Sequence, residues 1–442
     1  MAREDASPEV MDEAPSASRY GYSIALLTTI YLFNFVDRQI VNIVAEPIKR
    51  EFGLADWQLG AMTGLSFAIL YTLCGFPVAR LAERGDRSRL IALAVVGWSL
   101  FTALCGLAQT FTQFVLARIG VGLGEAGCTP PAHSLISDIV PQAKRASALA
   151  LYSMGAPMGQ LVGMAMGGFA AAEWGWRSVF FIAGAPGVLL AVLAILTLPE
   201  PRRAHGHNAA TRDEPEPFWR VLRLFLTNRS FMLVAGGGAA ASFVFYGLGA
   251  FYASFFLRNH AGQLAQAAAG MGVEPIGFLG LALGLSSGIA GVAGAVVGGR
   301  VADAWAARNG SAYVLLPALC SAVAAPLLLA AMFVPGLYPS IALIALASAL
   351  NSAWNGAAYA AALGLAPPRS RATASALMLF VFNIVGLGLG PLCVGLLSDA
   401  FAPSLGTGGG LRVGMAGATA AGLVAAACFW AARGRLQRDR IA

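Results

Sequence analysis

The chain has 442 residues, of which 57% are hydrophobic and only 12% are charged, and its formal net charge is +7. Soluble domains carry roughly 25% charged residues, so this chain has too few charges to cover a water-facing surface. It is therefore predicted to be an all-α membrane protein and not a soluble enzyme. The sequence contains no Gly-Lys phosphate loop, no His-Glu-x-x-His motif and no cysteine cluster with metal spacing, so we predict no ATPase, cofactor or metal site.

Twelve apolar segments are long enough to span a membrane, which requires about 20 mainly apolar residues. The chain is predicted to begin with a disordered cytoplasmic tail at 1–20. An N-terminal bundle at 21–198 contains helices at 21–43, 58–82, 90–108, 112–138, 146–171 and 176–198. A cytoplasmic linker at 199–229 leads to a C-terminal bundle at 230–432, with helices at 230–257, 277–306, 313–333, 338–364, 371–398 and 411–432. A short cytoplasmic tail at 433–442 completes the chain.

Lysine and arginine are distributed unequally between the predicted loops. With both termini inside, the inner segments contain 22 of these residues and the outer loops contain 5. This bias predicts cytoplasmic termini and an even number of helices. The positive charge is thus a topology signal, and no nucleic-acid partner is expected. Arginine outnumbers lysine 27 to 2, as is typical of GC-rich bacterial genomes, so we predict a monomer in a bacterial inner membrane.

Two loops of the first half recur in the second half. Residues 79–83 (ARLAE) resemble residues 299–303 (GRVAD), and residues 141–148 resemble residues 367–374. The offsets are 220 and 226 residues. Near-equal offsets at corresponding loops predict a duplicated six-helix unit.

Several motifs in the first half resemble a known family. The loop ARLAERGDRSR at 79–89 is similar to the signature of the major facilitator superfamily. Asn34-Phe35-Val36-Asp37-Arg38, the segment from Arg118 to Glu125 and Gly175-Trp176-Arg177 together resemble the spinster branch, which is associated with sphingosine-1-phosphate and lysophospholipid transport.

The resemblance implies the major facilitator fold, with 12 transmembrane helices in two pseudo-symmetric halves. It also implies a latch between the halves on the inner side, made by Glu83, Arg84, Arg87 and Asp303. Organic anion:cation symporters share the Asp-Arg pair and part of the later pattern. A small organic anion therefore remains an alternative cargo.

Four charged residues lie within predicted spans of the first half: Asp37, Arg38, Arg118 and Glu125. Such charges are costly in lipid and usually face a bundle interior or a wet cavity. Asp37 and Arg118 are each six residues from the outer end of their helix, so both lie roughly 9 Å deep and are predicted to pair. Glu125 lies two turns from Arg118 on the same face. We predict that Asp37 and Glu125 carry a coupling proton and that Arg38 and Arg118 bind substrate. The alternative is an ion pair that only positions the first and fourth helices.

The second half has no such charges but offers aromatic and neutral polar side chains. The predicted substrate ligands there are Tyr246, Asn351, Asn355, Tyr359 and Asn383. Three of them share one helical face, at spacings of 4 and 8 residues. The first, fourth, seventh and tenth helices are expected to line one cavity that Arg38, Glu125 and Asn355 face. The alternative is that the aromatic residues pack or face lipid.

These features predict a secondary active transporter driven by protons. Its cargo would be an amphiphilic anionic lipid, with membrane lipids and protons as its other partners. The alternatives are a proton-coupled organic-anion symporter, a drug exporter and a non-transporting membrane sensor. The longest predicted inner segment has 31 residues, which is too short for a signalling domain and disfavours the sensor.

Overall fold

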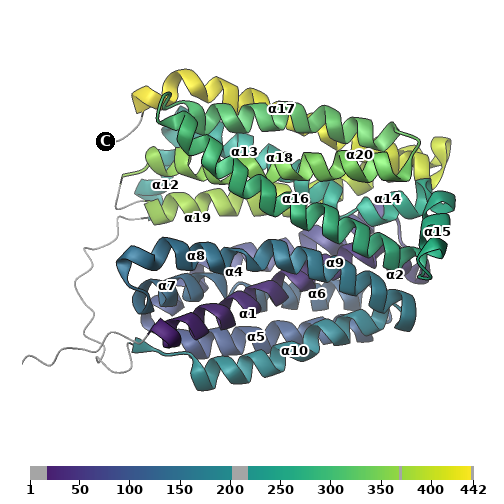
Figure 1. Cartoon of the computed structure of the whole chain (residues 1–442), viewed down its shortest axis with the longest axis horizontal. Helices are drawn as coiled ribbons and strands as arrows, with labels where there is room; N and C mark the ends of the chain where they lie inside the picture. The colour runs from purple at the N-terminus through teal and green to yellow at the C-terminus, as the bar shows by residue number, and fades with distance from the viewer. Residues whose placement is uncertain (1–16, 202–217, 368–370, 440–442) are drawn as a thin grey trace, which may run out of the picture.

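The computed structural model describes residues 17–201, 218–367 and 371–439, and every regular element in these ranges is a helix (Figure 1). The first half contains α1 (Ala17–Ile43), α2 (Ala45–Phe52), α3 (Asp56–Gly60), η1 (Ala61–Leu65), α4 (Ser66–Arg84), α5 (Arg87–Leu107), α6 (Phe111–Glu125), α7 (Thr129–Ile139), η2 (Gln142–Lys144), α8 (Arg145–Ser153), α9 (Gly155–Trp174) and α10 (Trp176–Thr197). The second half contains α12 (Phe218–Thr227), α13 (Arg229–Gly249), α14 (Tyr252–Asn259), α15 (Ala261–Gly270), α16 (Pro275–Ala306), α17 (Ala312–Phe333), α18 (Leu337–Gly364), α19 (Arg371–Val381), η4 (Phe382–Leu389) and α20 (Gly390–Asp439).

The helices account for the twelve predicted passes. Nine stretches of the described chain are long and apolar enough to cross a membrane. One of them, Thr373–Leu436, passes through Gly406, where φ is 74°, and therefore makes two passes. The other two passes are interrupted helices, α6 with α7 and α8 with α9. The prediction of an all-α membrane protein is confirmed.

The predicted boundaries differ from the structure mainly at the two tails and the linker. Helix α1 already begins at Ala17, and α20 continues to Asp439, so helix extends into both predicted tails. The predicted linker contains α12, and its residues 202–217 lie outside the described part of the chain. The division into bundles at 198 and 230 stays a prediction.

The fourth predicted span is interrupted between α6 and α7, where two prolines prevent regular hydrogen bonding. Prolines at 130 and 131 occupy the first turn of α7, where a missing N–H is tolerated, and the chain between Glu125 and Thr129 forms a turn. Glu125 is thus the last residue of α6. The interruption leaves this carboxylate at a helix end in the middle of the predicted fourth span.

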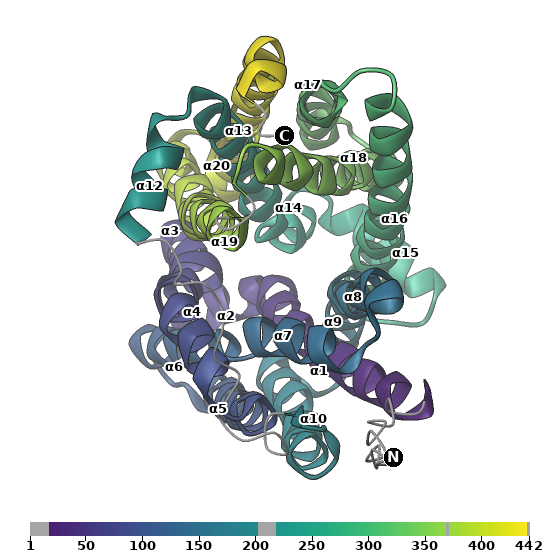
Figure 2. The same ribbon diagram turned by 90° about the vertical axis from the view of Figure 1, so that its left-hand side faces the viewer.

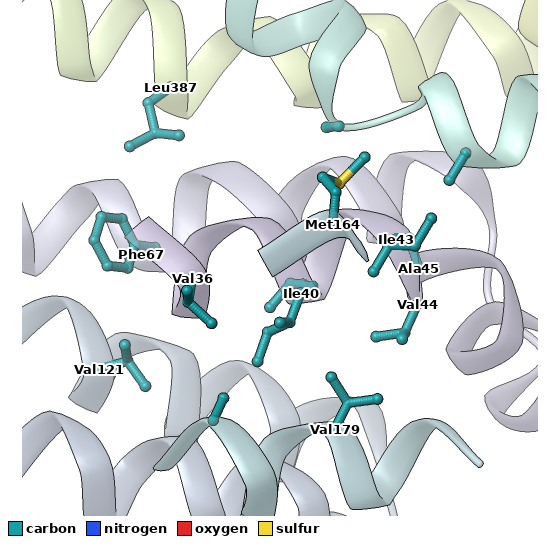
Figure 3. Packing of buried hydrophobic residues seen from close by; sticks show 14 of the residues in the cluster. Val36, Ile40, Ile43, Val44, Ala45, Phe67, Val121, Met164, Val179 and Leu387 are labelled. Atoms are coloured by element: carbon teal, nitrogen blue, oxygen red, sulfur yellow. The ribbon is translucent and has the colours of Figure 1, made fainter. Parts of the chain in front are cut away.

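Helix α9 packs closely against α1 because it presents glycines to it. A Cβ at Gly159 would lie 2.3 Å from the backbone oxygen of Leu32, and one at Gly163 would lie 3.0 Å from that of Val36. Only glycine permits such an approach. The apolar side chains of α1 that follow, Val36 and Ile40, have no exposed surface (Figure 3). This packing fixes the position of α1, which carries Arg38.

The two halves contact each other mainly at one end of the bundle. We call it the far end, because α1 begins and α20 ends at the opposite, terminus end (Figure 1). Seen from the terminus end, the helices form two separate groups (Figure 2). At the far end a Cβ at Gly60 would lie 2.2 Å from the backbone oxygen of Pro391, and one at Gly280 would lie 2.3 Å from that of Met164. The backbones of the two halves are therefore in direct contact at the far end, and this contact closes it.

Candidate functional site

A buried ion pair lies at the centre of the molecule. The Nε atom of Arg38 donates a hydrogen bond to Oε2 of Glu125 over 2.8 Å. The side chain of Arg38 is 10% exposed and that of Glu125 is fully buried. The other carboxylate oxygen of Glu125 has no hydrogen-bond partner among the described residues. The pair joins α1 to the end of α6 and leaves one oxygen of the acid available to a proton.

A cavity adjoins this pair between the two halves. The empty space, including its opening, amounts to about 490 Å³. Arg38 and Arg118 line it from the first half, and Phe245 and Tyr246 of α13 line it from the second half. The cavity thus combines two cationic side chains on one wall with aromatic side chains on the facing wall.

Neutral polar side chains also line the cavity, and the sequence analysis missed them: Gln39, Asn42, Thr63 and Gln160. Helical spacing could have found two of them. Asn42 lies four residues after Arg38, and Gln39 lies four residues after Phe35, which also lines the cavity. The face of α1 that carries Arg38 is therefore polar over more than one turn.

The predicted pair between Asp37 and Arg118 is wrong. Asp37 instead accepts a hydrogen bond from the hydroxyl of Thr102 on α5 over 2.9 Å, and its other oxygen has no partner among the described residues. Arg118 points into the cavity, with its guanidinium 5.2 Å from the ring centre of Phe67. The spacing along the helices gave the depth of Asp37 and Arg118 in the membrane, but it did not give the direction in which each side chain points. Adjacent residues of a helix point about 100° apart, so Asp37 faces away when Arg38 faces the cavity.

Of the polar residues predicted in the second half, Tyr246 lines this cavity. Asn351, Asn355, Tyr359 and Asn383 are not among its lining residues, and their part in substrate binding stays a prediction. Asn351 accepts a hydrogen bond from the Trp354 indole over 3.4 Å, and the Tyr359 ring packs against Phe382 with centroids 5.7 Å apart. Asn355 is exposed, and Asn383 is buried within η4.

Helices α9, η1, α4, η4 and α20 also contribute lining residues to this cavity. Helix α18 contributes none, so its expected place at the substrate site stays a prediction. Helix α16 covers the Ala349 face of α18, where a Cβ at Gly294 would lie 2.0 Å from the backbone oxygen of Ala349, whereas Asn351 and Asn355 lie on other faces of the helix. Glu125 also does not line the cavity and reaches it only through Arg38.

A second buried arginine joins the two halves at the far end. Arg258 of α14 donates two hydrogen bonds to Asp56, each 2.8 Å long, and others of 2.7 and 3.0 Å to Glu46. Burial alone lowers the pKa of Arg258, but hydrogen bonds and charge attraction from Asp56 and Glu46 outweigh it, so the pKa is raised. Asp56 also pairs with Lys49 and accepts a 2.6 Å hydrogen bond from Ser398. We call these residues, together with Asp399, the far-end cluster.

Asp399 completes this cluster from the second half. Its two carboxylate oxygens accept hydrogen bonds from the backbone N–H groups of Asp56 and Trp57 over 2.9 and 2.7 Å. These N–H groups begin α3 and have no partner within the helix, so the acid acts as a cap supplied by the other half. The sequence analysis assigned Arg258 to an outer loop and missed the cluster. The only sequence signal for this cluster was a set of charged residues close to the ends of predicted membrane spans.

Comparison with known proteins identifies the family. A model of the Major Facilitator Superfamily matches residues 27–391. The chain belongs to this superfamily. It is 32% identical over 98% of its length, and over 99% of the relative, to an MFS-type efflux pump of Mycolicibacterium smegmatis. It is also 29% identical to a probable L-galactonate transporter of Escherichia coli, over 38% of this chain and 37% of that one.

A solved structure confirms the resemblance to the spinster branch. It is a crystal structure of a bacterial homolog of the human lysosomal transporter spinster in an inward-facing and unoccupied conformation. Its TM-score to this chain is 0.85 at 31% identity, over 97% of this chain and 99% of that one. The protein is therefore a multi-pass major facilitator transporter and not an enzyme.

The signature loop of this transporter does not join the halves in the described residues. Arg87 is fully buried and pairs with Glu200 and Asp138, at 2.5 Å each, all within the first half. Asp303 accepts a 3.2 Å hydrogen bond from Tyr313 within the second half. The side chains of Glu83 and Arg84 lie outside the described residues. The halves are apart at this end, so the latch stays a prediction.

Proposed function

We propose that this transporter couples protons to the movement of an amphiphilic anion by alternating access. The observation that supports the proposal best is the pair of Arg38 and Glu125, buried beside the cavity with one acid oxygen unpartnered. A proton on Glu125 removes the charge that holds Arg38. The guanidinium is then available to an anionic group in the cavity, and carboxylates and phosphates suit its planar, bidentate donors.

The residues that line the cavity support an amphiphile, such as a lysophospholipid or a sphingolipid phosphate. An anionic head would lie beside Arg38 and Arg118, and an apolar tail would lie against Phe245 and Tyr246 of α13. Each buried methylene contributes about 0.8 kcal/mol, so affinity should rise with chain length. Alkyl phosphates of increasing length test this by titration calorimetry, and affinity independent of length favours the small organic acid. The similarity to a probable L-galactonate transporter supports that second candidate.

Alternating access requires the two ends of the bundle to open in turn. The far-end cluster would close the outer side in the described conformation, with both termini in the cytoplasm of a bacterial cell. Opening of the outer side would bring the terminus ends of the halves together, and there Arg87 and Asp303, with Glu83 and Arg84, would form the latch. We propose that the monomer performs this cycle in the inner membrane.

The test of coupling is a transport assay in proteoliposomes with a pH-sensitive dye inside. Dodecyl phosphate added outside should change the lumenal pH with the wild-type protein. Glu125→Gln should abolish this change and abolish accumulation driven by a pH gradient, while exchange of dodecyl phosphate across the membrane continues. The matched control is Glu173→Gln, which neutralises an exposed carboxylate of α9 and should leave transport unaltered. Proton movement that survives Glu125→Gln would contradict the proposal.

A further inference from the structure

Three aromatic rings surround the guanidinium of Arg38. Its carbon lies 5.0 Å from the ring centre of Phe35, 4.7 Å from that of Phe67 and 4.5 Å from that of Tyr71. Phe35 precedes Arg38 by one turn on α1. Phe67 and Tyr71 are one turn apart on α4, and their rings are stacked with centroids 5.1 Å apart. We call these three rings the aromatic cage.

We propose that the aromatic cage, through Phe67 and Tyr71 above all, keeps Arg38 beside the cavity after Glu125 takes up a proton. These residues are thus positioning residues, and the inference deepens the proposed function, on which it rests. Without the cage, a guanidinium that lost its ion pair with Glu125 would move toward water. With the cage, it stays in place and presents its N–H groups to the anionic cargo.

Arg38 has two kinds of partner: the carboxylate of Glu125, and the aromatic rings of the cage. Glu125 binds it through Nε alone, along the edge of the guanidinium. The rings contact the guanidinium carbon, and attraction between a cation and an aromatic ring strengthens when water is excluded. Phe67 is 1% exposed, so this condition is met. Loss of the Glu125 charge therefore leaves the ring contacts intact.

Phe67 also serves the second arginine of the cavity. The Arg118 guanidinium carbon lies 5.2 Å from the same ring centre, so one aromatic ring contacts both cations. Two guanidinium groups that share a cavity wall repel each other, and the repulsion grows when Glu125 is neutral. A common ring attracts both and keeps the pair together as a binding site for one anionic head.

The experiment measures access to Arg38 directly and needs neither cargo nor a proton gradient. Phenylglyoxal modifies arginine, and mass spectrometry of the purified full chain in nanodiscs gives the rate at Arg38. Glu125→Gln represents the protonated acid. Adding Tyr71→Leu removes one ring, and adding Tyr71→Phe keeps the ring. Arg177, whose side chain is 36% exposed, serves as the internal reference in every sample.

The expected result is an interaction between the two sites. In the Glu125→Gln background, Tyr71→Leu should speed modification of Arg38 by about tenfold, within the range of one desolvated cation–π contact, and Tyr71→Phe should not. With Glu125 intact, Tyr71→Leu should change the rate less than about threefold, because the ion pair still holds the arginine. A merely structural effect of the lost ring would speed modification equally in both backgrounds and would overturn the inference. Equal rates with leucine and phenylalanine at 71 would overturn it as well.

A second measurement separates this inference from the proposed function. Calorimetry with dodecyl phosphate should show about tenfold weaker binding in Glu125→Gln/Tyr71→Leu than in Glu125→Gln/Tyr71→Phe. Uncharged dodecyl maltoside should bind both variants equally. If labelling behaves as expected but no variant binds dodecyl phosphate, the cage stands and the proposed cargo is wrong. If dodecyl phosphate binds equally to both double variants, the cage does not position Arg38 for cargo.

Discussion

Arg258 and Arg38 are both buried arginines with carboxylate partners, but their surroundings differ. Arg258 at the far end uses Nε and both terminal nitrogens in hydrogen bonds, and its acids Asp56 and Glu46 come from the opposite half. Arg38 at the centre donates one hydrogen bond to Glu125, and the other oxygen of that acid has no hydrogen-bond partner among the described residues. A fully paired buried charge is costly to disturb, whereas a partly paired one can exchange partners. This difference supports the proposal that the far-end cluster closes one end of the bundle and that proton and anion exchange at the centre.

The largest effect is expected from breaking the far-end cluster. Arg258→Ala leaves Glu46 and Asp56 with too little positive charge in a buried place, and removal of one partner of such a set typically costs about 3–5 kcal/mol. The closed far end should therefore be less stable, with a lower thermal unfolding temperature and faster labelling of a cysteine introduced at the buried Ser254 of α14. Arg50→Ala is the matched control, because Arg50 also pairs with Glu46 but is 69% exposed. An equal loss of stability in Arg258→Ala and Arg50→Ala would show that burial does not make the Arg258 ion pairs more important than the exposed one.

The next effect is expected at the centre, where binding should suffer more than folding. Arg38→Ala should weaken binding of dodecyl phosphate by about 10- to 100-fold, as expected for loss of a hydrogen bond to a charged group of about 1.5–3 kcal/mol. Arg38→Lys keeps the charge but loses the planar donors, and should restore binding only in part. Calorimetry measures both. Full binding by Arg38→Ala would move the anion site away from the centre.

A smaller effect is expected at Asp37, which faces α5 and not the cavity. Thr102→Val removes the hydrogen bond from the Thr102 hydroxyl to the Asp37 carboxylate and should lower stability by about 1–3 kcal/mol. Thr102→Ser keeps the hydroxyl and should restore most of the loss. Thermal unfolding of the two variants measures this. Separately, Asp37→Asn should change the number of protons moved per cargo only if Asp37 also carries a proton, as the sequence predicts.

The smallest effect is expected from an exposed acid at the far end. Hydrogen bonds from Trp176 and Arg177 hold the pKa of Glu51 below its usual range despite opposing desolvation. A lowered pKa stabilises the fold above the unfolded-state pKa of about 4, and this contribution is lost as pH falls through the folded-state value. Because Glu51 is 45% exposed, Glu51→Gln should cost less than about 1 kcal/mol at neutral pH, and the cost should shrink as the pH falls below the unfolded-state pKa. A large cost at neutral pH would contradict the distinction between exposed and buried pairs.

The sequence predicted the passes well because apolar length and the lysine and arginine bias follow directly from the bilayer. It also identified Arg38, Arg118 and Glu125 as neighbours of one site, since charges in a span need a common polar place. It failed for the pair of Asp37 and Arg118 because depth along a helix does not give rotation about it. The stripe on α18 stays a prediction, since periodicity marks a face of a helix but does not show whether that face meets substrate. The far-end cluster depends on short helices and on contacts between residues about 200 apart, such as Arg258 and Glu46, which periodicity does not report.

The most direct measurement of the central claim is proton uptake on binding. Cargo and proton must influence each other's binding by the same factor if both act on Arg38 and Glu125. Calorimetric titration of dodecyl phosphate into the wild-type protein, repeated in buffers of different ionisation enthalpy, gives the number of protons taken up. A net uptake is predicted near neutral pH, and it should vanish in Glu125→Gln while binding remains. Binding without proton uptake in the wild type, or the same uptake in Glu125→Gln, would contradict the claim that a proton on Glu125 frees Arg38 for the cargo.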